Sequence, residues 1–132
     1  MRTILAAAIA GVVLTAGSAY AGDPESGAKV FNKCKACHMV GENAKNRVGP
    51  PLNGVVGRAF GTVEGFKYSP SLRELADAGR VWDEETLDAY LKNPKDIVPK
   101  GRMAFAGLKK SEDRDDVIAY LKQFNPDGTK KP

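Results

Sequence analysis

Apolar residues recur at helical spacing in several short segments of this chain, and these segments begin and end with residues typical of helix termini. Asp23 followed by Pro24 is an N-cap with proline at the first helical position, which predicts a helix running to about Lys35. Ser111 is the expected cap of a last helix, whose first turn carries acids that suit the helix dipole. Its apolar positions, expected to pack on the first helix, are Val117, Ile118, Tyr120, Leu121 and Phe124.

The middle of the chain contains a long loop and two further predicted helices. Residues 41–65 are rich in glycine, proline and asparagine, which indicates a loop, and a loop this long is usually functional. Ser69 and Pro70 start a short helix, and Asp83 caps another over residues 84–92, which an asparagine-proline pair stops. No strand pattern of useful length and no repeat is present, so we expect an all-α fold.

The N-terminal segment has the pattern of an export signal. One arginine precedes a nearly unbroken apolar run over residues 4–16, and Ala19-Tyr20-Ala21 forms an A-x-A cleavage site. The run is shorter than the ~20 apolar residues that span a bilayer. We expect residues 1–21 to be a secretory signal peptide cleaved after Ala21, and residues 22–132 to form a single domain. A retained N-terminal anchor is the alternative.

The most informative chemistry lies in residues 34–38, where the sequence reads Cys-Lys-Ala-Cys-His. This is the attachment signal of a c-type haem, in which two thiols three positions apart each add to one vinyl group. The next residue, His38, then lies under the iron and can bind it from one face. A zinc site or a redox disulfide could also use Cys34 and Cys37. The chain has only two cysteines and one histidine for zinc, and the motif follows a helix-like segment instead of a strand.

The second face of the iron needs another ligand, and the remaining candidates are methionines. Met1 leaves with the signal, and Met39 adjoins His38 on the same side of the ring. Met103 lies in a loop rich in glycine and proline over residues 99–107, which suits presentation of a thioether from irregular backbone. Met103 is therefore the expected ligand, with a lysine or an open site as the alternatives.

Ligation by histidine and methionine has a functional meaning. A soft, neutral thioether favours ferrous iron and raises the reduction potential. Iron with six ligands has no vacant position for oxygen or peroxide. Both properties indicate an electron carrier and not an enzyme. An open sixth site would instead indicate a peroxidase or a gas-binding protein. A haem that only stabilises the fold would indicate a structural or assembly role.

Several further motifs stand in order along residues 22–124. They are Gly-Asp-Pro-Glu-Ser-Gly-Ala-Lys-Val-Phe (22–31), Val-Gly-Pro-Pro-Leu-Asn-Gly-Val-Val-Gly-Arg (48–58), Gly-Phe-Lys-Tyr-Ser (65–69), Trp82, Tyr-Leu-Lys-Asn-Pro (90–94), Met-Ala-Phe-Ala-Gly (103–107) and Val-Ile-Ala-Tyr-Leu (117–121). With the haem motif, this set resembles class I, mitochondrial-type cytochromes c, especially the small periplasmic cytochrome c2 proteins of bacteria. The resemblance implies the class I cytochrome c fold, with about four to five short helices around one covalent haem c.

The resemblance also implies roles for residues around the haem. The carbonyl of Pro50 would accept the Nδ1–H of His38 and orient the imidazole. Tyr90 would lie near the sulfur of Met103. The side chains expected around the buried propionate are Arg58, Tyr68 and Trp82.

Two other parts of the chain bear on this resemblance. Where the terminal helices cross, Gly27 would allow the close approach that brings Phe31 to the last helix. Gly101 stands where relatives often have a threonine that contacts a propionate, and Leu72 stands where many have an asparagine. Both departures affect the solvation of the propionates and the potential, and neither affects the ligands.

The distribution of charge suggests a docking surface, although the formal net charge of +4 is uninformative. Basic residues flank the haem-bearing segments, where they would steer acidic partners: Lys33, Lys35, Lys100, Arg102, Lys109 and Lys110. The family suggests a cytochrome bc-type complex as donor and a terminal oxidase or photosynthetic reaction centre as acceptor; a periplasmic dehydrogenase is an equally suitable donor. We expect a periplasmic monomer that takes part in a respiratory or photosynthetic chain, with no stable membrane anchor. No motif for nucleic acid accompanies the basic charge.

Overall fold

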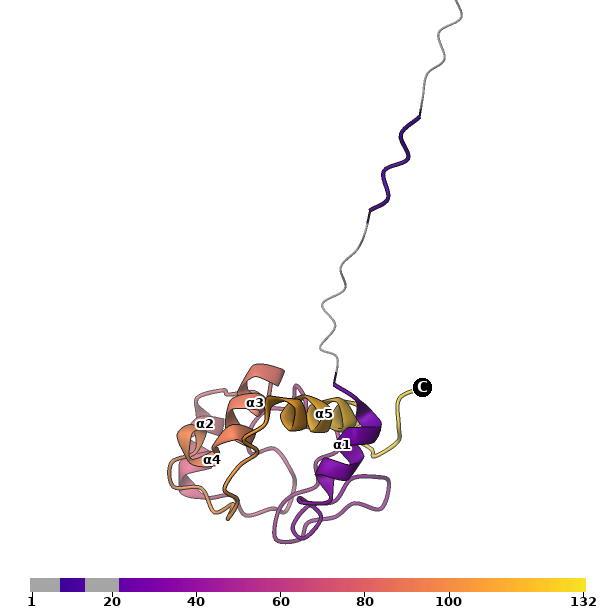
Figure 1. Cartoon of the computed structure of the whole chain (residues 1–132). Coiled ribbons are helices and arrows are strands. Elements are labelled where there is room, and N and C mark those ends of the chain that lie inside the picture. Colours follow the sequence, from indigo (N-terminus) through magenta and orange to yellow (C-terminus); the bar gives the residue numbers. More distant parts are fainter. Residues whose placement is uncertain (1–7, 14–21) are drawn as a thin grey trace, which may run out of the picture.

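The computed structural model describes residues 8–13 and 22–132, so the predicted cleavage site at residues 19–21 lies outside the described residues. Five helices make up the described domain, with long loops after α1 and α4 and shorter connections between the others (Figure 1). They are α1 (Pro24–Phe31), α2 (Pro70–Asp77), α3 (Glu84–Lys92), α4 (Pro94–Ile97) and α5 (Ser111–Lys122). Within these residues the only β pairing is two isolated bridges, so the prediction of an all-α fold is confirmed.

Three of the predicted helix starts are confirmed by their capping hydrogen bonds. The carboxylate of Asp23 accepts from the backbone N–H groups of the first turn of α1, with Pro24 at the first helical position. The hydroxyl of Ser69 caps α2, and the carboxylate of Asp83 caps α3. These starts were predictable because a cap is a local interaction within about three residues.

Two details of the helix predictions are wrong. The helix α1 ends at Phe31, and the chain continues through tight turns, with the Cys34 N–H donating to the Phe31 carbonyl over 2.8 Å. In α5, Ser111 is already helical, so Lys110 is the N-cap and no side chain caps the helix. The end predicted for the helix over residues 84–92 is confirmed. Pro94 also starts the short helix α4, which was not predicted, because a proline needs no N–H partner at the first helical position.

The terminal helices α1 and α5 cross at close range, with α1 beneath the end of α5 in Figure 1. Gly27 makes this possible, since a Cβ atom there would lie only 1.9 Å from the Asp116 carbonyl oxygen. The ring of Phe31 packs against that of Tyr120, with 5.3 Å between centroids. The carboxylate of Asp116 also accepts from the Asp23 N–H at 2.8 Å. This contact between the two ends of the domain agrees with what the resemblance implied.

The helices α3 and α4 pack together on the other side of the domain, and α3 also contacts α5, whereas α2 is joined to the rest through loops. A cluster of buried aromatic and aliphatic side chains lies between the two sides. In it Trp82 stacks on Phe60, with 3.7 Å between ring centroids, and contacts Tyr90 at 4.8 Å. Among the described residues, no helix has the length and apolar character needed to cross a membrane.

Candidate functional site

The two cysteines lie on the tight turns that follow α1. The His38 N–H donates to the Cys34 carbonyl over 2.9 Å, so the whole motif is folded into a compact turn. Both thiols are free and half-buried, and Cys34 packs against the apolar cluster. Burial raises the pKa of the Cys34 thiol above its usual value. Since redox-active cysteines have lowered pKa values, this environment does not favour a thioredoxin-like pair.

The imidazole of His38 is held from two sides. Its Nδ1 lies 2.7 Å from the carbonyl oxygen of Pro50, the contact that the resemblance implied. A Cβ atom at Gly49 would come within 2.4 Å of the ring, so only glycine fits beneath it. With Nδ1 donating to Pro50, the lone pair of Nε2 is left as the available ligand atom. Burial lowers the pKa of His38, which favours the neutral form that binds metals.

The thioether of Met103 is turned toward the aromatic cluster. The hydroxyl of Tyr90 donates to the Met103 sulfur over 3.6 Å, and both side chains are half-buried. Burial raises the pKa of Tyr90 to about 12, so this hydroxyl keeps its proton at neutral pH. Tyr90 thus lies near the sulfur, as the resemblance implied.

Arg58 and Trp82 are brought together by backbone pairing rather than by their side chains. The Trp82 N–H donates to the Arg58 carbonyl over 2.8 Å. The guanidinium of Arg58 donates to the carbonyls of Pro51 and Asn53, beside the loop that holds His38. The hydroxyl of Tyr68 accepts from a backbone N–H in the same long loop. Burial lowers the pKa of Arg58, an effect that the nearby Tyr68 opposes.

These donors fit a covalently bound haem. Two thiols, an imidazole with Nε2 available and a half-buried thioether are the groups that such a cofactor needs. In the part of the chain that the structure describes, no three His, Cys, Asp or Glu side chains gather as a metal cluster. A zinc site with the usual four ligands therefore finds no support there.

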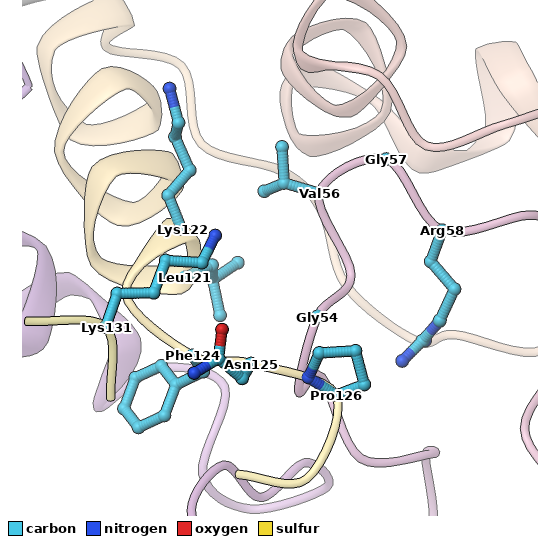
Figure 2. Close-up of a pocket in the computed structure, with 10 residues that line it drawn as sticks. All are labelled: Gly54, Val56, Gly57, Arg58, Leu121, Lys122, Phe124, Asn125, Pro126 and Lys131. Atoms are coloured by element: carbon cyan, nitrogen blue, oxygen red, sulfur yellow. The ribbon is translucent and has the colours of Figure 1, made fainter. Parts of the chain in front are cut away.

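A separate open groove of about 400 Å³ lies between residues 54–58 and the end of α5 (Figure 2). Its lining includes Leu121, Phe124 and Pro126, with Lys122 and Lys131 beside them. None of the cysteines, His38 or Met103 lines this groove. Arg58 does line it, so the groove borders the candidate site at this one side chain and does not include the thiols or the possible iron ligands.

The comparison with known proteins identifies the family. The cytochrome c family profile matches residues 24–125. This chain belongs to the cytochrome c family. It is 57% identical over 107 residues to cytochrome c-550 of Ancylobacter novellus, across 81% of this chain and all of that protein. It is 51% identical over 107 residues to cytochrome c2 of Afifella marina, across 81% of this chain and 86% of that protein.

Solved structures agree with this assignment. The structure of cytochrome c2 from Rhodospirillum centenum matches with a TM-score of 0.75 and 43% identity, over 80% of this chain and all of that one. The fold of this cytochrome is therefore the class I cytochrome c fold, and its relatives are bacterial cytochromes c2 and c-550. Such proteins bind one covalent haem c and transfer electrons; they are not enzymes.

The six basic residues expected at the docking surface are all exposed in this cytochrome. Lys109 differs from the others, since its amine donates to the carbonyls of Lys92 and Ala106 over 3.2 and 3.1 Å. The Lys109 amine therefore links the end of α3 to the loop of residues 99–107, which carries Met103.

Several contacts around the site were not foreseen from the sequence. Gly49 supports the His38 ring, and Phe60 stacks on Trp82. The amide of Asn53 donates to and accepts from the backbone of Gly41, which closes the loop after the motif. Only the Gly-Pro pair at 49–50 carries a local signal for such a role, since glycine is favoured where backbone approaches another group closely. The others depend on contacts between distant segments.

Proposed function

We propose that this cytochrome is a diffusible one-electron carrier whose haem iron is bound by Nε2 of His38 and by the sulfur of Met103. The thiols of Cys34 and Cys37 would hold the haem covalently. When bound, this group supplies reversible transfer of one electron between ferric and ferrous iron.

The orientation of Met103 carries this proposal. Its sulfur receives a hydrogen bond from the Tyr90 hydroxyl in a half-buried position. The segment that carries Met103 follows α4, far along the chain from the motif, and few other iron ligands are possible because the chain has one histidine. A half-buried thioether held by a hydrogen-bond donor is suited to ligation that leaves no site for oxygen.

The protein's own groups would each set one property of the site. The Pro50 carbonyl holds the Nδ1 proton of His38 and fixes the direction of Nε2. The Tyr90 hydroxyl donates to the sulfur and limits the electron density that it can give, which favours a high reduction potential. The stacked rings of Phe60 and Trp82 would exclude water from one side of the haem site. We propose that Arg58, Tyr68 and Trp82 also surround a propionate.

Docking of redox partners is proposed at the exposed basic residues, defined here as the basic ring: Lys33, Lys35, Lys100, Arg102, Lys109 and Lys110. Positive charge in this position would steer weak, fast encounters with acidic patches. Suitable partners are a cytochrome bc-type complex or a periplasmic dehydrogenase as donor, and an oxidase or reaction centre as acceptor. We place the mature protein in the periplasm on the basis of the export signal predicted at residues 1–21 and of thioether attachment across the membrane.

Carbon monoxide distinguishes this function from a peroxidase or gas-binding protein. We expect the reduced holoprotein to bind almost none at neutral pH, because His38 and Met103 would together leave no position open on the iron. The absorption spectrum before and after addition of the gas is the measurement. Rapid and complete binding would mean an open sixth site and would reject the carrier function.

Charge reversal tests the basic ring. We expect Lys35→Glu combined with Lys110→Glu to slow reaction with an acidic redox partner about tenfold or more at low salt, and much less at high salt. Neither amine makes a hydrogen bond or an ion pair within the described residues, so the change is one of charge alone. Stopped-flow kinetics over a range of salt concentrations measure this effect.

A matched control is Lys67→Glu combined with Lys131→Glu, which alters the net charge equally at two exposed lysines outside the basic ring. We expect this variant to react at nearly the rate of the parent. Equal slowing by both pairs would show that net charge, and not a docking surface, governs the reaction.

A further inference from the structure

Arg114 is buried near the start of α5, with only 7% of its surface exposed. Its Nε donates to the carboxylate of Asp88 on α3 over 2.7 Å. Its Nη1 donates to two backbone carbonyls, those of Leu108 at 2.9 Å and Lys109 at 3.1 Å. One guanidinium therefore joins α5, α3 and the end of the segment that carries Met103.

The same end of that segment is packed tightly on the C-terminal turn of α3. The Leu108 N–H donates to the Leu91 carbonyl over 2.7 Å. At Gly107, which has φ of +107°, a Cβ atom would come within 2.1 Å of the Lys92 carbonyl oxygen. These contacts need Leu108 to stay where Arg114 holds it.

The other end of the segment is held less firmly. Residues 99–106 contain no helix, and the Lys100 N–H donates to the Ser71 hydroxyl at 3.3 Å in an exposed position. Near Met103 itself the Tyr90 hydroxyl is the side-chain partner, through a 3.6 Å contact to sulfur. Segments with few buried contacts open most easily, so opening is expected to begin at this end and to be limited by the firmly held end.

We propose that Arg114, oriented by Asp88, is a positioning residue that keeps the segment 99–110, here called the Met103 loop, closed against α3. The functional part of this inference rests on the proposed ligation by Met103. Loss of the guanidinium leaves the carbonyl of Leu108, a buried residue, without its donor, which costs the closed loop free energy. The open loop places that carbonyl in water and avoids this cost. Removing Arg114 therefore favours opening.

The first test is hydrogen exchange of backbone amides in the holoprotein. We expect Arg114→Met and Arg114→Lys to speed exchange of the Leu108 amide about tenfold. Loss of a buried hydrogen bond costs about 1.4 kcal/mol, and this free energy corresponds to a factor of ten in the open population. Lysine keeps the charge but cannot bond Asp88 and two carbonyls at once. The Phe31 amide in α1 should change much less.

The matched control is Lys122→Met. Lys122 pairs with Glu84, so this variant also removes an ion pair between α5 and α3, but one that does not reach the Met103 loop. We expect Leu108 exchange in this control close to that of the parent. Unchanged Leu108 exchange in both Arg114 variants, or equal acceleration at Leu108 and Phe31, would overturn the proposal.

The second test links the loop to the iron site. Imidazole can occupy the sixth position only when Met103 has left it, so its apparent affinity scales with the open fraction. We expect about a tenfold rise in this affinity for Arg114→Met and a smaller rise for Asp88→Asn, which keeps an oxygen acceptor but loses the charge. Faster Leu108 exchange with unchanged imidazole affinity would overturn the positioning role. If Met103→Ala itself binds imidazole no better than the parent, the proposed ligation by Met103 is wrong. Leu108 exchange in the Arg114 variants then tests by itself whether Arg114 holds the Met103 loop closed.

Discussion

Replacing Met103 with alanine is expected to lower the reduction potential by about 0.1–0.2 V and to open the iron to added ligands. Axial ligands set haem potentials over a range of about 0.8 V, and loss of a soft thioether removes its preference for ferrous iron. Tyr90 would keep its place in the aromatic cluster through Trp82, so the change should be confined to the ligand. A redox titration measures the potential, and carbon monoxide or imidazole binding measures the vacancy.

Met39→Leu is the matched control for this variant. Met39 adjoins His38, and its backbone carbonyl accepts from the Leu52 N–H at 3.0 Å, a bond that does not depend on the side chain. We expect its potential and spectrum to stay close to those of the parent. An unchanged absorption spectrum in Met103→Ala would show that another residue binds the iron.

Removing both thiols is expected to abolish covalent haem attachment and, with it, most of the folded structure. In Cys34→Ser combined with Cys37→Ser no thioether can form, so haem should be extracted completely by acid and organic solvent. The helices leave many apolar side chains only half-buried, including Leu52, Leu72 and Phe105 around the cluster. A small domain has only ~5–15 kcal/mol of stability, so loss of the contacts with an enclosed cofactor should prevent folding.

The measurements are solvent extraction of haem and the helical circular dichroism signal. The single variants Cys34→Ser and Cys37→Ser serve as controls, because each keeps one thiol and should retain haem after extraction. Covalently retained haem in the double variant would contradict the attachment at these two residues. A fully helical, haem-free double variant would show that the polypeptide core suffices for folding.

Helix starts were the most predictable part of the fold. Asp23, Ser69 and Asp83 each cap a helix through bonds to N–H groups two or three residues away, so the information is local. The cap predicted at Ser111 was wrong by one position, because a serine before acidic residues also fits the first turn of a helix. The early end of α1 at Phe31 could not be foreseen, since it depends on the turns that fold the motif.

The site was predictable to the extent that its parts are local or resemble a known family. The thiols and the imidazole occupy five consecutive residues, and their chemistry follows from that spacing. The contacts of His38 with Pro50 and of Met103 with Tyr90 agree with the resemblance, although their role at the iron stays a prediction. The bonds of Arg114 carry no local signal, because an arginine in an acidic helix ordinarily indicates a solvated surface.

By itself the sequence determined the attachment motif, the short list of possible iron ligands and an all-α fold, because each depends on residue type and near-neighbour spacing. Tertiary structure alone decided which groups support those ligands. Gly49 lies under the His38 ring, and Arg114 anchors the Met103 loop through carbonyls on one segment and Asp88 on another. The physical reason is that backbone carbonyls are the same in every residue, so a bond to them is specified only when distant segments fold together.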